Sequence, residues 1–181
     1  MLLAPTHEEE ITHLVAQNIN SYRQLPLRLY QIGPKFRNEA RPKGGLLRCR
    51  EFLMKDLYTF DANEESAIAT YSEVCEAYDR IFKRLEIAAI KAKASSGAIG
   101  GSHSHEYHIA CESGQDSVLQ CQKCNFTGNS EVFTDSKCSQ CGSHDFKEVK
   151  ALEIGHTFLL GEKYSRVLEA KFKDQQGKQQ V

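Results

Sequence analysis

The chain has 181 residues and a mass of 20.4 kDa, with 40% hydrophobic residues, 26% charged residues and a formal net charge of −1. These values are typical of an ordinary globular protein, with room for one sizeable domain and a small satellite and no need of disulfides. No apolar run is long enough for a membrane-spanning helix. We also expect neither a signal peptide nor a transit peptide, because charged residues follow directly after Met-Leu-Leu-Ala-Pro.

The first expected elements are a helix and a long basic hairpin. The run Thr6-His7-Glu8-Glu9 is a capping box that predicts a helix start with Thr6 as the N-cap. An apolar stripe at helical spacing follows at Ile11, Leu14, Val15 and Ile19. Two extended segments, 27–39 and 47–60, flank the turn-forming run Pro42-Lys43-Gly44-Gly45, which predicts a hairpin. Residues 23–55 carry nine Lys or Arg against two Glu, a charge excess that attracts phosphate groups.

A long helix and several strands are expected further along the chain. A second capping box, at 61–64, predicts the start of an amphipathic helix. Its apolar face consists of Ile68, Tyr71, Val74, Cys75, Tyr78, Ile81, Phe82 and Leu85. Strands are predicted at 87–91, 106–110 and 151–160, and the polar tail from Lys173 is expected to be frayed. Strands joined by hairpins, with helices between some of them, predict an antiparallel α+β fold.

The basic hairpin carries the strongest chemical signal of the chain. Arg37 and Glu39 share one face of the first strand, and Arg48, Arg50 and Phe52 share one face of the second. If these two faces coincide, guanidinium groups, a carboxylate and an aromatic ring gather on one surface. Guanidinium groups bind phosphate oxygens through paired donors, and a phenyl ring can stack on a purine. The alternative interpretation is a solvated ribbon whose charges keep an edge strand soluble.

A cysteine motif predicts a metal site. Cys121-x-x-Cys124 is followed, after thirteen residues, by Cys138-x-x-Cys141. Two such pairs can place four thiolates around Zn²⁺ in a closed, structural site. The alternatives are free thiols, or a site in which His144 replaces one of the cysteines.

Four motifs in this order resemble a known family. Phe36-Arg37-Asn38-Glu39, followed by residues 48–56, resembles motif 2 of class II aminoacyl-tRNA synthetases. Residues 5–9, residues 97–106 with their Gly-rich start, and Glu153-Ile154-Gly155-His156 narrow the resemblance to the prolyl-tRNA synthetases of the bacterial and organellar type.

The resemblance implies a class II synthetase-like antiparallel sheet with flanking helices. It implies a partial catalytic core at 1–120, a small zinc-ribbon-like insertion at 121–150, and a return to the core at 151–181 that stops before motif 3. An editing domain, which many bacterial members carry at this point, does not fit into the insertion. The chain therefore resembles the organellar form, which implies a mitochondrial matrix location, and otherwise a cytoplasmic one.

The activity implied by the resemblance is that of a proline–tRNA ligase. Such an enzyme activates proline with ATP and Mg²⁺ to prolyl-adenylate and transfers the prolyl group to tRNA(Pro). The resemblance also implies a homodimer and no association with a membrane. Arg37 is the implied catalytic residue, facing both the α-phosphate and the proline carboxylate. Thr6 and Glu8 are the implied partners of the proline imino group. The remaining implied ATP-binding residues are Glu39, Arg48, Phe52, Glu153 and His156.

Two other hypotheses remain at this stage. One is a zinc-ribbon module that binds RNA through the basic hairpin without catalysis, and its affinity would fall steeply with salt. The other is a fragment with only an interaction role, which would not bind ATP. If motif 3 is missing, the isolated chain is expected to be inactive or only partly active as an enzyme.

Overall fold

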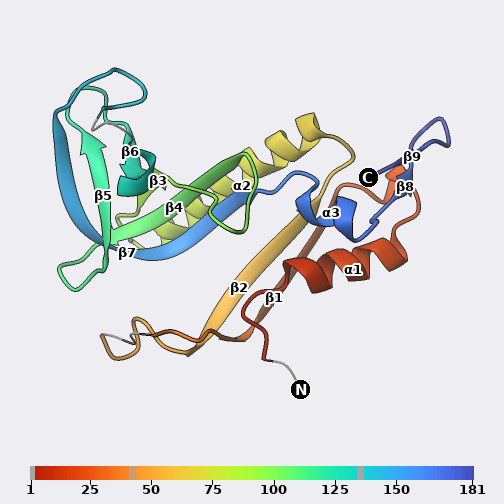
Figure 1. The fold of residues 1–181 in the computed structure, drawn as a ribbon, viewed down its shortest axis with the longest axis horizontal. Coiled ribbons are helices and arrows are strands. Elements are labelled where there is room, and N and C mark those ends of the chain that lie inside the picture. Colours follow the sequence, from red (N-terminus) through yellow and green to blue (C-terminus); the bar gives the residue numbers. More distant parts are fainter. Residues whose placement is uncertain (1–2, 41, 43, 134–136) are drawn as a thin grey trace. The chain divides into compact units, whose positions relative to one another are not determined.

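The computed structural model describes residues 3–40, 42, 44–133 and 137–181. The chain divides into two compact units, shown in Figure 1. The hairpin unit comprises Met1–Ala67 and Gly161–Val181, and the barrel unit comprises Ile68–Leu160. Among the described residues, none of the helices has the length and apolar character that a bilayer crossing requires.

The hairpin unit is built around two long strands. Its elements are α1 (Glu8–Asn18), the 3-10 helix η1 (Tyr22–Gln24), β1 (Leu27–Phe36), β2 (Glu51–Phe60), α3 (Lys163–Val167), β8 (Phe172–Lys173) and β9 (Gln179–Gln180). β1 and β2 pair antiparallel without interruption, from Leu27 opposite Phe60 to Phe36 opposite Glu51. The apolar stripe of α1 contributes Val15 and Ile19 to a small core, which Phe172 completes.

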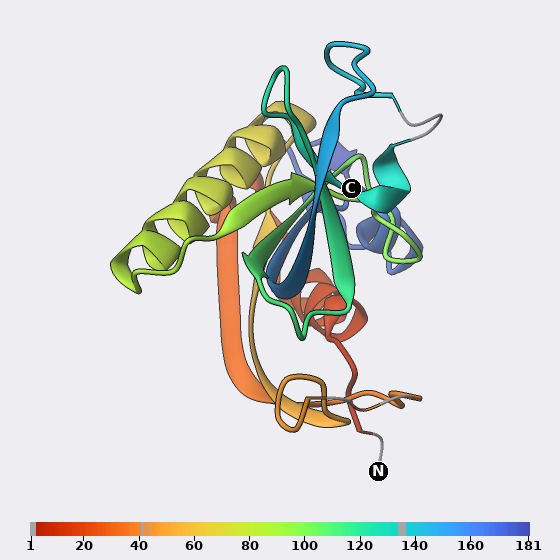
Figure 2. The same cartoon turned by 90° about the vertical axis from the view of Figure 1, so that its left-hand side faces the viewer.

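The barrel unit is a closed arrangement of five strands. Its elements are β3 (Ile90–Lys93), β4 (His103–Ala110), β5 (Asp116–Cys121), β6 (Thr127–Asn129), the 3-10 helix η2 (Ser130–Val132) and β7 (Phe146–Leu159). The strand order is β3-β4-β7-β5-β6, and β7 pairs with β5 along its first half and with β4 along its second half (Figure 2). Every pairing is antiparallel except that of β3 with β6.

The long helix α2 (Glu64–Arg84) begins in the hairpin unit and continues into the barrel unit. Its apolar face packs Tyr78 and Phe82 on Tyr107 of β4, with ring centres 5.2 and 5.4 Å from the Tyr107 ring. Tyr107 is fully buried, so this aromatic group anchors the helix on the barrel. The predicted antiparallel α+β fold with flanking helices is confirmed.

Three local predictions were wrong. The N-cap of α1 is His7 rather than Thr6, and no side chain caps that helix end. The capping box at 61–64 predicts Asp61 as the cap of α2. Instead, the side chain of Asn63 accepts a hydrogen bond from the backbone N–H of Ser66 at 2.9 Å. The tail is ordered, because Lys173 pairs with Gln179.

Candidate functional site

The loop end of the β1–β2 hairpin, where residues 37–50 connect Phe36 to Glu51, gathers the predicted phosphate-binding side chains. The backbone N–H of Arg37 donates to the carbonyl of Arg50 at 2.8 Å, which extends the ladder beyond Phe36. Lys35 lies opposite Phe52, so Arg37 and Phe52 lie on the same face. The guanidinium carbon of Arg37 lies 5.3 Å from the centre of the Phe52 ring, a cation–π contact. The two predicted faces therefore coincide at this end of the hairpin.

Glu39 holds two further arginines at the same end. Its carboxylate accepts a hydrogen bond from Nε of Arg48 at 2.7 Å, and its backbone carbonyl accepts one from Nε of Arg50 at 3.0 Å. The Arg48 side chain remains 47% exposed, while that of Glu39 is 21% exposed. The pair therefore fixes the Arg48 side chain and leaves it accessible to an anionic ligand.

The segment before α1 is attached to this hairpin. Backbone N–H of Phe36 donates to the carbonyl of Ala4 at 3.0 Å, and Nε of Arg37 donates to the carbonyl of Pro5 at 3.2 Å. The hydroxyl of Thr6 donates to the carboxylate of Glu8 at 2.5 Å. These hydrogen bonds join the segment that carries Thr6 and Glu8 to the strand end that carries Arg37. The resemblance assigns these three residues to proline.

A polar cluster behind this segment was missed by the sequence analysis. Asp56 accepts hydrogen bonds from Lys35 at 3.2 Å, from Gln31 at 2.9 Å and from the Tyr58 hydroxyl at 2.8 Å. The Tyr58 hydroxyl in turn accepts one from the backbone N–H of His7 at 3.2 Å. Alternation along the strands was the available signal, because these four strand residues share a face once the register is known.

Burial and hydrogen bonding shift the pKa values in this cluster. Burial raises the pKa of Tyr58 well above its usual range, and its hydrogen bond to Asp56 raises it further. Burial also raises the pKa of Asp56, but hydrogen bonds to its carboxylate outweigh burial and leave this pKa below the ordinary value. Tyr58 therefore stays a neutral donor and Asp56 a charged acceptor, which fixes the segment that carries Thr6 and Glu8.

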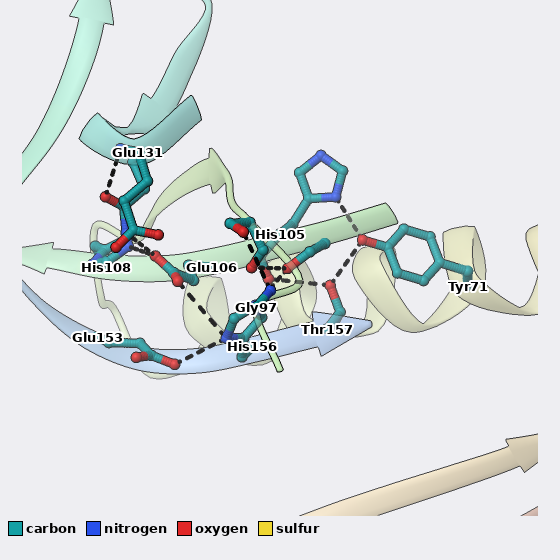
Figure 3. A network of polar contacts seen from close by, with 12 residues as sticks. Tyr71, Gly97, His105, Glu106, His108, Glu131, Glu153, His156 and Thr157 are labelled. Carbon is teal, nitrogen blue, oxygen red and sulfur yellow. Dashed lines mark hydrogen bonds and ion pairs between the residues drawn. The ribbon is translucent and has the colours of Figure 1, made fainter. Parts of the chain in front are cut away.

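The barrel unit holds a second group of predicted residues, shown in Figure 3. Nδ1 of His156 lies 3.4 Å from a carboxylate oxygen of Glu153 and 3.9 Å from one of Glu106. Ligand atoms of these three residues all lie within 4.8 Å of one another. Carboxylate oxygens with one imidazole nitrogen can bind a divalent cation.

A β-bulge places Glu153 and His156 on one face. Residues three apart on a regular strand point to opposite faces. Here Glu153 lies opposite His108 and His156 lies opposite Glu106, while the register shifts between them. Ile154 is the extra residue of β7, and the bulge turns Glu153 to the side of His156.

The same network contains residues that the sequence analysis did not assign. Glu106 accepts hydrogen bonds from Nε2 of His108 at 2.9 Å and from the side-chain amide of Asn129 at 3.1 Å. Burial raises the pKa of Glu106, yet these two bonds outweigh it, and the pKa lies below the ordinary value. His105 points to α2, where Nδ1 lies 2.6 Å from the Tyr71 hydroxyl (Figure 3). Glu106 is therefore a charged member of the site, and His105 joins α2 to the barrel.

The four motif cysteines converge at one end of the barrel. Their sulfur atoms lie within 4.8 Å of one another, with Cys121 3.6 Å from Cys141 and Cys124 3.5 Å from Cys138. Burial raises the pKa of Cys121, but backbone N–H groups donating to its sulfur outweigh it and lower the pKa to about 6. At Cys124 a backbone hydrogen bond lowers the pKa, but burial and the other three cysteines outweigh it and raise this pKa to about 12. Cys121 is therefore more readily available as a thiolate than Cys124.

The two Cys-x-x-Cys turns have the same backbone geometry. The carbonyl of Cys121 accepts from the N–H of Asn125 at 3.0 Å, and that of Cys138 accepts from the N–H of Gly142 at 2.8 Å. Asn125 and Gly142 both have left-handed φ values, 58° and 70°. Matching turns present two sulfur atoms each, the arrangement that a tetrahedral four-thiolate site requires.

The chain matches one family model over its whole length. This model, described as the tRNA synthetase class II core domain for G, H, P, S and T, matches residues 1–181. The chain is 49% identical over 178 residues to the probable mitochondrial proline–tRNA ligase of Rattus norvegicus, an alignment that covers 97% of the chain and 37% of that relative. It is 43% identical over 200 residues to the proline–tRNA ligase of Sulfurimonas denitrificans, covering 98% of the chain and 45% of that relative. The chain thus spans less than half the length of these curated relatives.

Solved structures share the fold. The prolyl-tRNA synthetase of Cryptosporidium parvum complexed with halofuginone and AMPPNP matches 98% of this chain and 30% of that chain, with a TM-score of 0.71 and 19% identity. The same synthetase complexed with L-proline and AMP gives a TM-score of 0.70. At this identity the likeness shows the fold, and it agrees with the α+β prediction.

Proposed function

This chain belongs to the family of class II tRNA synthetase core domains, and on that basis we propose that it is the proline- and ATP-binding part of a proline–tRNA ligase. The observation that carries the proposal is the joining of the Thr6–Glu8 segment to the Arg37–Phe52 surface within one unit. The relatives named above as proline–tRNA ligases support the choice of proline among the amino acids of the family.

Proline binding is assigned to Thr6, Glu8 and Arg37. The ring nitrogen of proline is a charged secondary ammonium with two N–H donors, so it needs acceptors such as the Glu8 carboxylate and the Thr6 hydroxyl. Nε of Arg37 lies 3.2 Å from the backbone carbonyl oxygen of Pro5, directly before Thr6. Its guanidinium group bears the positive charge that can pair with the proline carboxylate. We therefore assign all three side chains to the same bound proline.

ATP binding is assigned to Arg37, Glu39, Arg48 and Phe52 of the hairpin unit. The two guanidinium groups bind phosphate oxygens, and the Phe52 ring stacks on adenine through the face that Arg37 does not cover. In the barrel unit, Glu153 and His156 are assigned to ATP as well, together with Mg²⁺. When bound, this ion would neutralise charge on the phosphate oxygens.

The proposed reaction needs no covalent intermediate with the protein. A carboxylate oxygen of proline attacks the α-phosphorus of ATP, and the bond to pyrophosphate breaks. The terminal ribose hydroxyl of tRNA(Pro) then attacks the prolyl carbonyl, loses its proton, and AMP leaves. Arg37 acts by orienting the two substrates and by stabilising negative charge on the α-phosphate, since catalysis here depends on position and electrostatics.

The four cysteines are assigned to a structural Zn²⁺ site. The matching turns around Cys121–Cys124 and Cys138–Cys141 fit four sulfur ligands, and all four positions would be filled. Such a site lacks an open position for water, so it would stabilise the end of the barrel without taking part in the reaction. We further propose a homodimer and, from the names of the mammalian and fungal relatives, a location in the mitochondrial matrix.

Exchange of labelled pyrophosphate into ATP tests the proposal. The experiment uses this chain extended to the length of its relatives, here called the extended protein. We expect exchange that depends on proline and that threonine or serine does not support. Exchange with another amino acid but not with proline would overturn the substrate. RNA binding with no exchange for any amino acid would favour the non-catalytic RNA-binding module.

A further inference from the structure

We propose that Glu106 is a positioning residue that orients the imidazole of His156, and that Asn129 from the Cys-rich segment, residues 121–150, holds Glu106 in place. The proposal rests on the proposed function only where it connects His156 to ATP. The contacts themselves lie entirely within the barrel unit.

The first link is the fixed carboxylate of Glu106. One of its oxygens accepts hydrogen bonds from both His108, at 2.9 Å, and Asn129, at 3.1 Å. His108 is only 1% exposed and Glu106 12% exposed, so neither side chain is free to turn into solvent. With one oxygen held by two donors, the other is directed at Nδ1 of His156, 3.9 Å away.

The second link is the orientation of His156. Nε2 lies 2.6 Å from the Ser104 hydroxyl, and the ring stacks on Phe158 with centres 3.8 Å apart. Nδ1 faces the carboxylates of Glu106 and Glu153. Two negative groups beside Nδ1 favour the tautomer that carries its proton there. The Ser104 hydroxyl lies 2.6 Å from Nε2 and 3.4 Å from the carbonyl oxygen of Ser95, and in this tautomer it donates to Nε2 through the shorter contact.

The third link connects this site to the cysteine cluster. Asn129 ends β6 and lies opposite Val118 of β5. The same hairpin contains Cys121, whose N–H donates to the carbonyl of Phe126 at 2.8 Å. The turn that presents sulfur atoms and the amide that holds Glu106 therefore belong to one short hairpin. The Cys-rich segment thus contributes a side chain to the network around His156.

Nitrogen NMR of the 181-residue chain with ¹⁵N-labelled histidine tests the orientation directly. The His156 signals are assigned by their loss in His156→Gln. We expect a protonated Nδ1 in the parent chain, and a mixture of tautomers in Glu106→Gln and Asn129→Ala. Gln122→Ala is the matched control, because the exposed Gln122 amide donates to the backbone carbonyl of Gln120 in the same segment, and the substitution should leave the spectrum unchanged.

Unchanged His156 signals in Glu106→Gln, with an unchanged melting temperature, would overturn the proposal. Should Asn129→Ala unfold, Asn129→Ser removes the long amide donor while keeping a polar side chain. In the extended protein, Glu106→Gln should raise KM for ATP about tenfold and change KM for proline much less. A changed spectrum with unchanged KM for ATP would support the positioning of His156 by Glu106 and contradict the assignment of His156 to ATP. Failure of the positioning proposal and failure of the ATP assignment are therefore distinguishable.

Discussion

The guanidinium group of Arg37 lies over the ring of Phe52, with 5.3 Å between its central carbon and the ring centre. One face of the Phe52 ring thus stabilises the arginine, and we assign adenine to the other face. We expect Phe52→Leu in the extended protein to raise KM for ATP roughly tenfold, because stacking on an aromatic ring contributes about 1–3 kcal/mol per base. Pyrophosphate exchange at varied ATP concentrations measures this change.

A control for this variant lies next to it on β2. Leu53→Ala changes a side chain that is 74% exposed and lies on the opposite face, so KM for ATP should not change. Phe52→Trp keeps an aromatic ring and should retain most of the affinity. Equal KM values for Phe52→Leu and the parent would contradict the assignment of adenine to this ring.

Asp56 should make the stability of the hairpin unit depend on pH. Its pKa lies below the ordinary carboxyl value, because hydrogen bonds to the carboxylate outweigh burial. A lowered pKa in the folded state stabilises the fold above the unfolded pKa of about 4, and this stabilisation is lost as the pH falls through the folded pKa. Urea unfolding between pH 3 and 7 should therefore show a loss of stability at the acid end that is smaller in Asp56→Asn.

The same substitution should lower stability at neutral pH. Asp56→Asn leaves the ammonium group of Lys35, a side chain that is 1% exposed, without its carboxylate partner. Breaking a buried ion pair in this way costs about 3–5 kcal/mol. The double variant Lys35→Met/Asp56→Asn removes the unpaired charge and should recover part of this loss. Equal stability of the single and double variants would show that the ion pair is not the cause.

Much of the hairpin site was predictable from alternation alone. The parity of Arg37 and Glu39, and that of Arg48, Arg50 and Phe52, predicts one shared face within each strand. The register then shows that Arg37 and Phe52 lie on the same face of the hairpin, because no bulge interrupts β1 or β2. The cysteine spacing likewise predicts a cluster, since each Cys-x-x-Cys turn is a local structure. Both the faces of the hairpin strands and the cysteine cluster were therefore predicted from patterns of residues that are close together in the sequence.

Contacts that depend on long-range register were not predictable. Alternation places Glu153 and His156 on opposite faces, and only the bulge at Ile154 brings them together. The bond between Asn129 and Glu106 joins strands that are not neighbours in sequence, so no local pattern indicates it. Thr6 was predicted to cap α1, whereas its hydroxyl donates to the Glu8 carboxylate.

The cysteine cluster should bind one zinc ion per chain. Metal analysis of the purified chain should show this ratio, and Cys121→Ser should abolish it, because a closed tetrahedral site needs all four ligands. Removal of the metal by a chelator should lower the melting temperature. Cys49→Ser and Cys111→Ser are matched controls that lie outside the cluster and should keep the zinc. Zinc retained in Cys121→Ser would contradict the proposed ligand set.

Gly101 should be essential for the loop before β4. A Cβ atom at this position would lie 2.2 Å from the backbone carbonyl oxygen of Leu159, and the residue has a left-handed φ of 107°. Gly97 also has a positive φ, but nothing lies within 4 Å of its Cβ position. Gly97→Ala should therefore cost about 1 kcal/mol, and Gly101→Ala clearly more, in the free energy of unfolding. If both variants lost the same free energy of unfolding, the close approach of Gly101 to Leu159 would not be the cause of the destabilisation.

The central claim is that Arg37 contacts both substrates. Arg37→Lys retains the positive charge but loses the paired donors, so kcat/KM for proline-dependent pyrophosphate exchange should fall about 100-fold or more. Arg28→Ala removes a charge from β1 on the face opposite to that of Lys35 and Arg37, and it should leave the exchange unchanged. These rates, measured side by side in the extended protein, test the account most directly. A loss confined to Arg37→Lys is the predicted result, and exchange within about twofold of the parent in that variant would contradict it.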